Sequence, residues 1–278
     1  MRLLSLLLLS CAVFAQELAL RPTLQSGDVF ELELVRSRED SRRPQLNGSS
    51  RTPVQVRVLE AGPNGFVLAW RPGATSFDNP EIVKNPVAAL AANALKDTPL
   101  EIVLDPGGKF SGLRNQAAVT TKLLALRDES FARYSAGLDD PQRKQAVANI
   151  VQRLLAPEAL LSAAAADVQT YFSLHGSKLT RAKPVETAIQ QPSPQGSGTI
   201  AATYRVTLEL LDAHEAKIAT ITTYPKQPAL KLADSGYYVY NRAFGIMSDV
   251  VIVRSAAGAD SFSRKDTSEI RLVTKPAR

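Results

Sequence analysis

The clearest pattern in the chain is an alternation of apolar and polar side chains. Near the N-terminus, Phe30, Leu32 and Leu34 alternate with Glu31 and Glu33. Successive side chains of a β-strand point to opposite faces, so a period of two predicts a strand with one buried and one wet face. The same alternation recurs later in the chain and predicts further strands through residues 100–104, 204–210, 236–241, 247–255 and 262–273.

A β-hairpin is predicted over residues 54–70. Valines alternate with polar residues on the way to the turn, and Phe66, Leu68 and Trp70 alternate with other residues after it. The turn contains Asn64–Gly65, and both residue types tolerate the positive φ angles that a tight hairpin turn requires. These features together predict two antiparallel neighbours in a sheet.

Two parts of the chain have the spacing of amphipathic helices instead. Residues 85–96 begin with a capping residue followed by a proline, which is typical of a helix start. The pattern of residues 115–175 predicts three successive helices, with breaks between them near Gly137 and at Pro157. The strongest apolar stripe repeats at helical spacing and is formed by Val147, Ile150, Val151, Leu154 and Leu155.

The order of these elements predicts the fold class. Strands in two blocks with helices gathered between them are typical of α+β proteins, because a doubly wound sheet would alternate strand and helix. We therefore predict a curved, half-barrel-like antiparallel β-sheet with the block of amphipathic helices covering one face. Residues 16–278 are expected to form one domain. Residues 183–198, rich in Pro, Gly and Ser, are the best linker candidate and would divide it into halves 16–182 and 199–278.

Residues 1–15 predict where the protein is sent. Met1–Arg2 is followed by an apolar run that ends in small residues at Ala15, the expected cleavage site of a signal peptide. A bilayer span needs about 20 apolar residues, and no run in the chain reaches that length, so no transmembrane span is expected. We predict an exported protein that is periplasmic or secreted. The alternative is a lipid anchor through Cys11, because Leu8–Cys11 loosely resembles a lipobox.

Few residues suggest metal or cofactor chemistry. Cleavage after Ala15 removes Cys11, the only cysteine, and with it any disulfide or thiolate ligand. His175 and His214 lie far apart and outside any metal-binding motif, so no metal is predicted. No cofactor is predicted either. Gly196–Ala201 matches a relaxed dinucleotide-binding pattern, but it precedes a predicted strand where that pattern requires a helix.

Charge narrows the function only slightly. The formal net charge is +6, but basic and acidic residues are interspersed. The densest basic cluster consists of Arg36, Arg38, Arg42, Arg43 and Arg51. Acidic residues interrupt this cluster, which favours a solvated loop, and the alternative is a weak binding patch for lipid headgroups or polysaccharide. No nucleic-acid partner is predicted.

Catalytic motifs give little support to an enzyme. The sequence contains no G-x-S-x-G elbow, S-x-x-K pair or P-loop. Asp139 and Asp140 are adjacent carboxylates, but they precede a predicted helix, where side-chain oxygens usually cap backbone amides. We therefore favour a non-enzymatic protein. A metal-independent hydrolase that uses carboxylates is the alternative.

Several short segments resemble a family of exported bacterial proteins that is classified as a domain of unknown function. The matching segments are Gly27–Phe30, Val54–Trp70, Asn85–Pro86 and Leu100–Gly112. The resemblance covers most of the mature chain and implies the same order of strands and helices, but it implies no active site. At the level of the fold, the predicted sheet and helices are also similar to the half-barrels of periplasmic lipoprotein carriers, which implies an apolar concavity.

These observations lead to a functional hypothesis. We expect an exported, non-enzymatic protein that binds a lipid or another apolar or amphiphilic ligand, or an envelope protein partner. The residues expected to line its pocket are Phe30, Leu32, Trp70, Leu104, Phe110, Leu123, Leu154 and Leu161. The alternative for each of them is that it fills a dry core. A further alternative is a structural component of an envelope complex, which would expose a contiguous apolar patch.

Overall fold

The structure is a computed structural model that describes most of the chain. The described residues are 17–84, 86–192, 198–225, 230–258 and 261–276. The predicted signal peptide, with Ala15 and Cys11, lies outside them, as does segment 193–197 of the predicted linker. Within the described ranges, no helix combines the length and the apolar character that crossing a bilayer requires.

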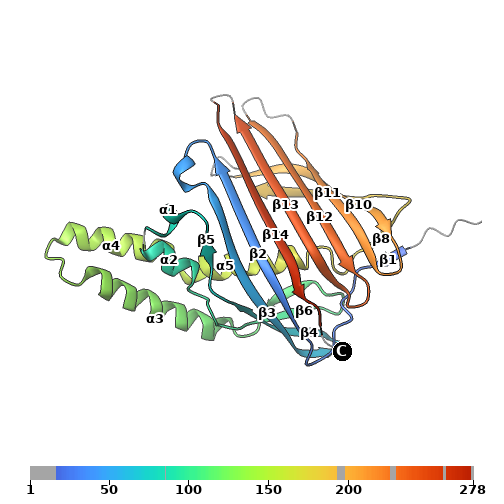
Figure 1. Ribbon diagram of the computed structural model, residues 1–278, viewed down its shortest axis with the longest axis horizontal. Helices are drawn as coiled ribbons and strands as arrows, with labels where there is room; N and C mark the ends of the chain where they lie inside the picture. The colour runs from blue at the N-terminus through green and yellow to red at the C-terminus, as the bar shows by residue number, and fades with distance from the viewer. Residues whose placement is uncertain (1–16, 85, 193–197, 226–229, 259–260, 277–278) are drawn as a thin grey trace, which may run out of the picture.

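A 12-stranded antiparallel sheet dominates the described part of the chain (Figure 1). In spatial order, the strands are β7 (Phe110–Leu113), β6 (Leu100–Leu104), β4 (Gly65–Pro72), β3 (Gly48–Gly62), β2 (Val29–Asp40), β14 (Ser263–Thr274), β13 (Ile246–Gly258), β12 (Leu230–Asn241), β11 (Glu215–Thr223), β10 (Thr199–Leu211) and β9 (Val185–Pro192). Strand β5 (Ser76–Phe77) pairs with β3 beside this path. The order begins at β7 and ends at β9, so the sheet is open.

The two blocks of strands meet in the middle of the sheet. β2, from the first block, pairs with β14, the last strand of the chain, in a register that runs from Arg264 opposite Asp40 to Leu272 opposite Leu32. The predicted α+β class with a large curved antiparallel sheet is therefore confirmed. The division of the chain into domains stays a prediction.

Part of the predicted linker is a strand. β9 spans Val185–Pro192 and pairs antiparallel with β10 along its whole length. The composition was misleading because Pro184 precedes the strand and Pro192 ends it, and an edge strand tolerates proline at such positions. The prediction of a linker over residues 183–198 is therefore wrong for residues 185–192.

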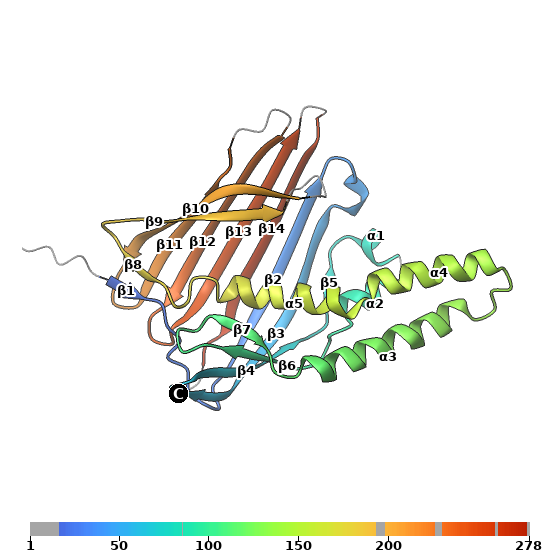
Figure 2. The same cartoon turned by 180° about the vertical axis from the view of Figure 1, so that it is seen from behind.

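The helices lie between the two blocks in the sequence. They are α1 (Pro80–Val83), α2 (Pro86–Ala92), α3 (Gln116–Ser135), α4 (Pro141–Leu154) and α5 (Pro157–Tyr171). Figure 2 shows α5 crossing the concave side of the sheet, while α3 and α4 run side by side and project beyond the sheet. α5 is therefore the helix that crosses the concave face, while Val87 of α2, Leu123 of α3 and Val151 of α4 pack into the same core cluster.

The main core lies between the concave face and α5. Phe30 of β2 and Trp70 of β4 are buried there with Tyr171 and Phe172 at the end of α5. The rings of Trp70 and Tyr171 meet edge to face with their centroids 6.1 Å apart. The hydroxyl of Tyr171 donates to the backbone oxygen of Met247 at 2.6 Å, which fixes the end of α5 to β13.

The first described residues form a strap across the same core. β1 (Glu17–Ala19) pairs with β8 (Lys178–Thr180) in a separate small sheet. Leu20 follows β1 and is fully buried. The hydroxyl of Tyr240 accepts from the backbone N–H of Arg21 at 3.1 Å and donates to its carbonyl oxygen at 2.8 Å. These bonds anchor the strap to β12.

Candidate ligand-binding face

The concave face of the sheet has a part that α5 covers and a part that lies beyond α5 (Figure 2). In β2, Phe30, Leu32 and Leu34 are buried in the main core. Arg36, two residues further along the same face, forms an ion pair with Asp167 of α5. The Arg36 side chain is 50% exposed, so the cover that α5 provides ends at this pair.

Beyond α5, four charged side chains form a row across neighbouring strands. The register places Arg38 of β2 opposite Asp266 of β14, and Asp266 opposite Arg254 of β13. Arg254 in turn lies opposite Asp234 of β12. Directly paired residues share one face of an antiparallel sheet, so all four lie on the concave face with Arg36. We call Arg38, Asp266, Arg254 and Asp234 the charged row.

Two arginines hold Asp266. Arg38 Nε donates to Asp266 Oδ1 at 2.8 Å, and Arg264 Nε donates to Asp266 Oδ2 at 2.7 Å. Burial disfavours the ionised carboxylate, but the bonds from the two arginines outweigh it, and the pKa of Asp266 is lowered from its ordinary value. Asp266 is therefore ionised at neutral pH and positions both guanidinium groups.

Asp234 is only loosely paired with Arg254, so the guanidinium of Arg254 can still bind a ligand. The hydroxyl of Tyr224 donates to Asp234 Oδ2 at 2.7 Å. Burial and this bond raise the pKa of Tyr224, which keeps the phenol neutral and able to donate. Arg254 Nε lies 3.8 Å from the same oxygen, and the Arg254 side chain is 62% exposed against 15% for Asp234. At 3.8 Å no normal hydrogen bond joins the pair, so the Arg254 guanidinium can bind another anion.

A second group of apolar residues lies on the far side of the charged row from the main core. Leu230 of β12, Ala256 of β13 and Ala202 of β10 are buried, with exposed fractions of 9%, 9% and 7%. The register places part-buried Leu232 opposite Ala256 and part-buried Ile189 opposite Ala202. We call these five residues the distal apolar patch. Among the described residues, the main core cluster includes none of them.

The part of the concave face beyond α5 therefore combines charged side chains with the part-buried Leu232 and Ile189 and is amphiphilic. A guanidinium group binds carboxylates and phosphates with paired, charge-assisted hydrogen bonds. The neighbouring apolar surface contributes about 25 cal/mol for each Å² that a ligand removes from water. A molecule with an anionic head and an apolar chain would match both features at once.

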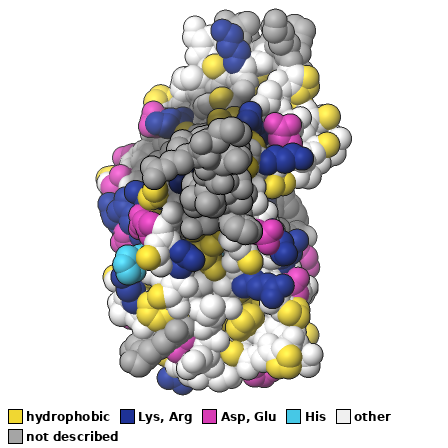
Figure 3. Space-filling view, turned by 90° about the vertical axis from the view of Figure 1, so that its right-hand side faces the viewer, with side chains coloured by type: hydrophobic (Ala, Val, Ile, Leu, Met, Phe, Trp, Pro, Cys, Tyr) yellow, Lys and Arg dark blue, Asp and Glu magenta, His cyan; other side chains and the backbone are white. Residues whose placement is uncertain are grey.

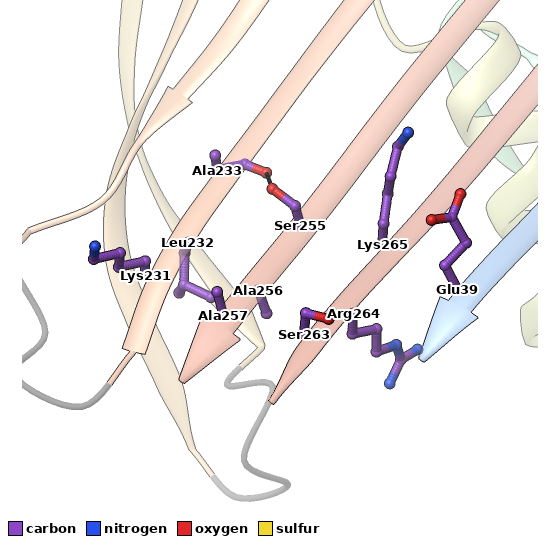
Figure 4. Close-up of a pocket in the computed structure, with 10 residues that line it drawn as sticks. All are labelled: Glu39, Lys231, Leu232, Ala233, Ser255, Ala256, Ala257, Ser263, Arg264 and Lys265. Carbon is purple, nitrogen blue, oxygen red and sulfur yellow. Dashed lines mark hydrogen bonds between the residues drawn. The ribbon is translucent and has the colours of Figure 1, made fainter. Parts of the chain in front are cut away.

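The described surface also has two clefts, and Leu232 and Ala256 of the distal apolar patch contribute to the lining of the first. The first, of about 320 Å³, lies at the ends of β2, β12, β13 and β14, and Glu39 is the one carboxylate among its described lining residues (Figure 4). The other, of about 430 Å³, lies beside His214 and residues 241–244, and its described lining has no carboxylate. Neither cleft offers the pair of carboxylates that the hydrolase hypothesis requires.

The two histidines lie in different surroundings. His175 is buried, and its Nε2 lies 3.0 Å from the carbonyl oxygen of Gly245. His214 is exposed in the turn between β10 and β11. In the part of the chain that the structure describes, no three His, Cys, Asp or Glu side chains are grouped to hold a metal ion.

Comparisons with protein families, curated proteins and solved structures give five chains of solved structures that match this chain. No family model matches the chain, and no curated protein matches it. A solved structure described as "Lipid-protein interactions in lipovitellin" matches with a TM-score of 0.40 and 9% sequence identity. The match covers 91% of this chain and 26% of that chain, so this chain spans about a quarter of the matched protein. A likeness this weak supports no argument about function, and the resemblance to the exported bacterial family stays a prediction.

The residues that were predicted to line a pocket all lie in or against the main core. Six of them are buried in it, namely Phe30, Leu32, Trp70, Leu104, Leu123 and Leu161. Phe110 and Leu154 are partly buried and pack against it. The structure thus brings these sheet and helix residues together as expected. Neither described cleft has any of them in its lining, and their role in ligand binding stays a prediction.

Sequence reasoning missed the charged row. The basic cluster was interpreted as a solvated loop, but Arg36 and Arg38 lie in β2 and Arg51 lies in β3. The available clue was periodicity, because Arg36 and Arg38 continue the alternate positions occupied by Phe30–Leu34. The solvated-loop interpretation fails for these arginines because both strands extend further than their apolar residues indicate.

Proposed function

We propose that the protein is an exported, non-enzymatic binding protein for an amphiphilic ligand such as a lipid. The anionic head of the ligand lies against the exposed guanidinium of Arg254, and its apolar chain lies on the distal apolar patch. The main core beneath α5 holds the fold together and leaves the rest of the concave face for binding. Export, to the periplasm or out of the cell, rests on the predicted signal peptide and is part of this proposal.

One observation carries the proposal: an apolar patch outside the main core lies beside a poorly paired cation. An uncovered face of an antiparallel sheet normally carries polar side chains. Here Leu232 and Ile189 lie on that face, and Arg254 is 62% exposed with its nearest carboxylate oxygen 3.8 Å away. An amphiphile would cover the apolar side chains and complete the hydrogen bonds of the guanidinium.

Binding of a fluorescent fatty acid, competed by unlabelled dodecanoate, tests the role of Arg254. We expect a Kd in the micromolar range for the wild-type protein, on the order of −8 kcal/mol. Arg254→Gln should weaken binding by a factor of about 10 to 100, because a hydrogen bond to a charged group contributes roughly 1.5–3 kcal/mol. Leu232→Gln should also weaken binding, because it places an amide in the apolar patch.

A matched arginine on the opposite face provides the control. Arg205 of β10 lies opposite Ile221 on the convex face. Its side chain is 52% exposed and its Nε lies 3.7 Å from a carboxylate oxygen of Glu186, so its ion pair is as weak as that of Arg254. Arg205→Gln should leave the affinity unchanged. Unchanged affinity in Arg254→Gln, or an equal loss in both variants, would rule out the proposed site.

A further inference from the structure

The end of the sheet at which β2 finishes and β14 begins carries an ordered group of loops. It comprises the turn Ser41–Leu46, which includes the short 3-10 helix η1 (Pro44–Leu46), the segment Phe262–Lys265, and Lys231 at the start of β12. We call these residues the sheet tip. It lies at the upper end of β2 and β14 in Figure 1.

Hydrogen bonds join the two sides of the sheet tip. The backbone N–H of Ser41 donates to the carbonyl oxygen of Ser263 at 2.9 Å, and the backbone N–H of Ser263 donates to Ser41 Oγ at 2.9 Å. The guanidinium carbon of Arg42 lies 4.4 Å from the centre of the Phe262 ring, in a cation–π contact. The turn and the start of β14 are therefore held together as one platform.

The sheet tip is rich in basic side chains that are not engaged in ion pairs with described residues. Four exposed cations form no ion pair with a described residue: Arg42, Arg43, Lys231 and Lys265. Of the nearby acids, Asp40 accepts from the backbone N–H of Arg42, and Glu39 lies opposite Lys265 in the register. By contrast, basic and acidic side chains are interspersed on the face shown in Figure 3.

The cleft of about 320 Å³ opens among these cations. Small side chains form much of its lining, namely Ala233, Ser255, Ala256, Ala257 and Ser263 (Figure 4). Leu232 and the charged residues Lys231, Lys265, Arg264 and Glu39 complete it. Leu46, at the end of η1, is 41% exposed. The sheet tip thus combines unpaired cations, a shallow cleft and a projecting apolar side chain.

We infer that the sheet tip docks on a membrane surface that carries anionic phospholipid headgroups. The cations lie against the headgroup phosphates, the cleft receives one headgroup, and Leu46 enters the interface. Basic groups on a surface are attracted to anionic lipids at short range, and salt screens this attraction. The cleft shares Leu232 and Ala256 with the distal apolar patch. The docking cations and Leu46 are not part of the concave binding site, so the inference does not depend on the proposed function.

Sedimentation with phospholipid vesicles tests the inference. We expect the full-length mature protein to bind vesicles made of equal parts phosphatidylglycerol and phosphatidylcholine, and to bind pure phosphatidylcholine vesicles much more weakly. The double variant Arg43→Gln with Lys265→Gln should weaken binding about fivefold for each cation removed. Binding should also weaken as salt is raised.

A second double variant removes the same charge elsewhere. This control combines Lys144→Gln with Arg153→Gln. Both residues lie on α4, are exposed and form no ion pair with a described residue. The control should bind anionic vesicles as the wild-type protein does. Equal losses in the two double variants would overturn the inference, because net charge alone would then explain binding. Equal binding to both kinds of vesicle would also overturn it.

Two further arms keep the result interpretable. If inorganic phosphate abolishes vesicle binding while chloride at the same ionic strength does not, the cleft is a site for soluble phosphate and the inference fails. If thermal melting shows that the tip double variant is unfolded, Lys231→Gln alone replaces it, with the same expected loss per cation. Arg254→Gln should sediment with anionic vesicles as the wild-type protein does, which separates this test from that of the concave site.

Discussion

His175 is a buried histidine with one unpartnered ring nitrogen. Its Nε2 lies 3.0 Å from the carbonyl oxygen of Gly245, and because a carbonyl only accepts, Nε2 carries the proton. Nδ1 is then a bare acceptor, and it has no hydrogen-bond partner among the described residues. Burial lowers the pKa of His175 from 6.5 to about 4, because a charged imidazole in this site would lose its hydration.

The protein should therefore lose stability as the pH falls from about 6.5 toward 4. In this window the unfolded chain binds a proton at His175 and the folded chain does not. The shift corresponds to a loss of roughly 2 kcal/mol between pH 7 and pH 5. Urea unfolding at these two pH values measures the loss. His175→Gln should show a smaller difference, and an equal difference in both proteins would contradict the assignment.

At the scale of elements, local chemistry sets where helices begin and how strands run. Asp140 precedes α4, and its carboxylate accepts from the backbone N–H of Gln142 at 2.8 Å, as an N-cap does. The predicted capping role of this carboxylate is therefore confirmed. β9 shows the limit of such reasoning, because its composition indicates a linker and only its pairing with β10 makes it a strand.

Two adjacent aspartates allow the capping role to be measured. Asp140→Ala removes the acceptor for an otherwise unpaired amide and should destabilise the protein by about 1 kcal/mol in urea unfolding. Asp139 is exposed and lies just outside the cap position. Asp139→Ala should change stability by less than about 0.5 kcal/mol. A similar loss in both variants would mean that the effect is one of charge and not of capping.

At the scale of the whole molecule, pairing between β2 and β14 unites the two blocks of strands. Ile270 of β14 lies opposite Leu34 of β2, and both side chains are buried in the main core. If the described chain is a single domain, disturbing this contact should destabilise both blocks together. If residues 16–182 and 199–278 are separate domains, each block should unfold by itself.

Unfolding followed by two probes distinguishes these cases. Trp70, the only tryptophan, reports on the first block, while far-ultraviolet circular dichroism reports on all strands. We expect the fluorescence and circular-dichroism transitions to coincide. Ile270→Ala should lower the free energy of unfolding measured by either probe by about 2–4 kcal/mol. Val273→Ala, in the same strand but 64% exposed, should have little effect. A Trp70 transition that Ile270→Ala leaves unmoved would contradict a single domain.

Much of the fold could be predicted because it depends on local periodicity. Alternation through Phe30, Leu32 and Leu34 predicts a strand whose inner face is buried, and the structure buries these side chains. The helices within residues 115–175 are also predicted from local periodicity, because their apolar residues repeat at helical spacing. The candidate site could not be predicted in this way, because Arg254 and Leu232 acquire their roles only from the strands that lie beside them.

The sequence by itself determined most of the strands and helices and which of their apolar side chains avoid water, but not strand β9 or the full length of β2 and β3. Only the tertiary structure decided where α5 stops covering the sheet and which charges meet beyond it. Arg38 and Asp266 are 228 positions apart, and they form a hydrogen bond only because β2 and β14 pair in one register. Periodicity fixes the face on which a side chain lies, whereas its neighbours across the sheet depend on strand order.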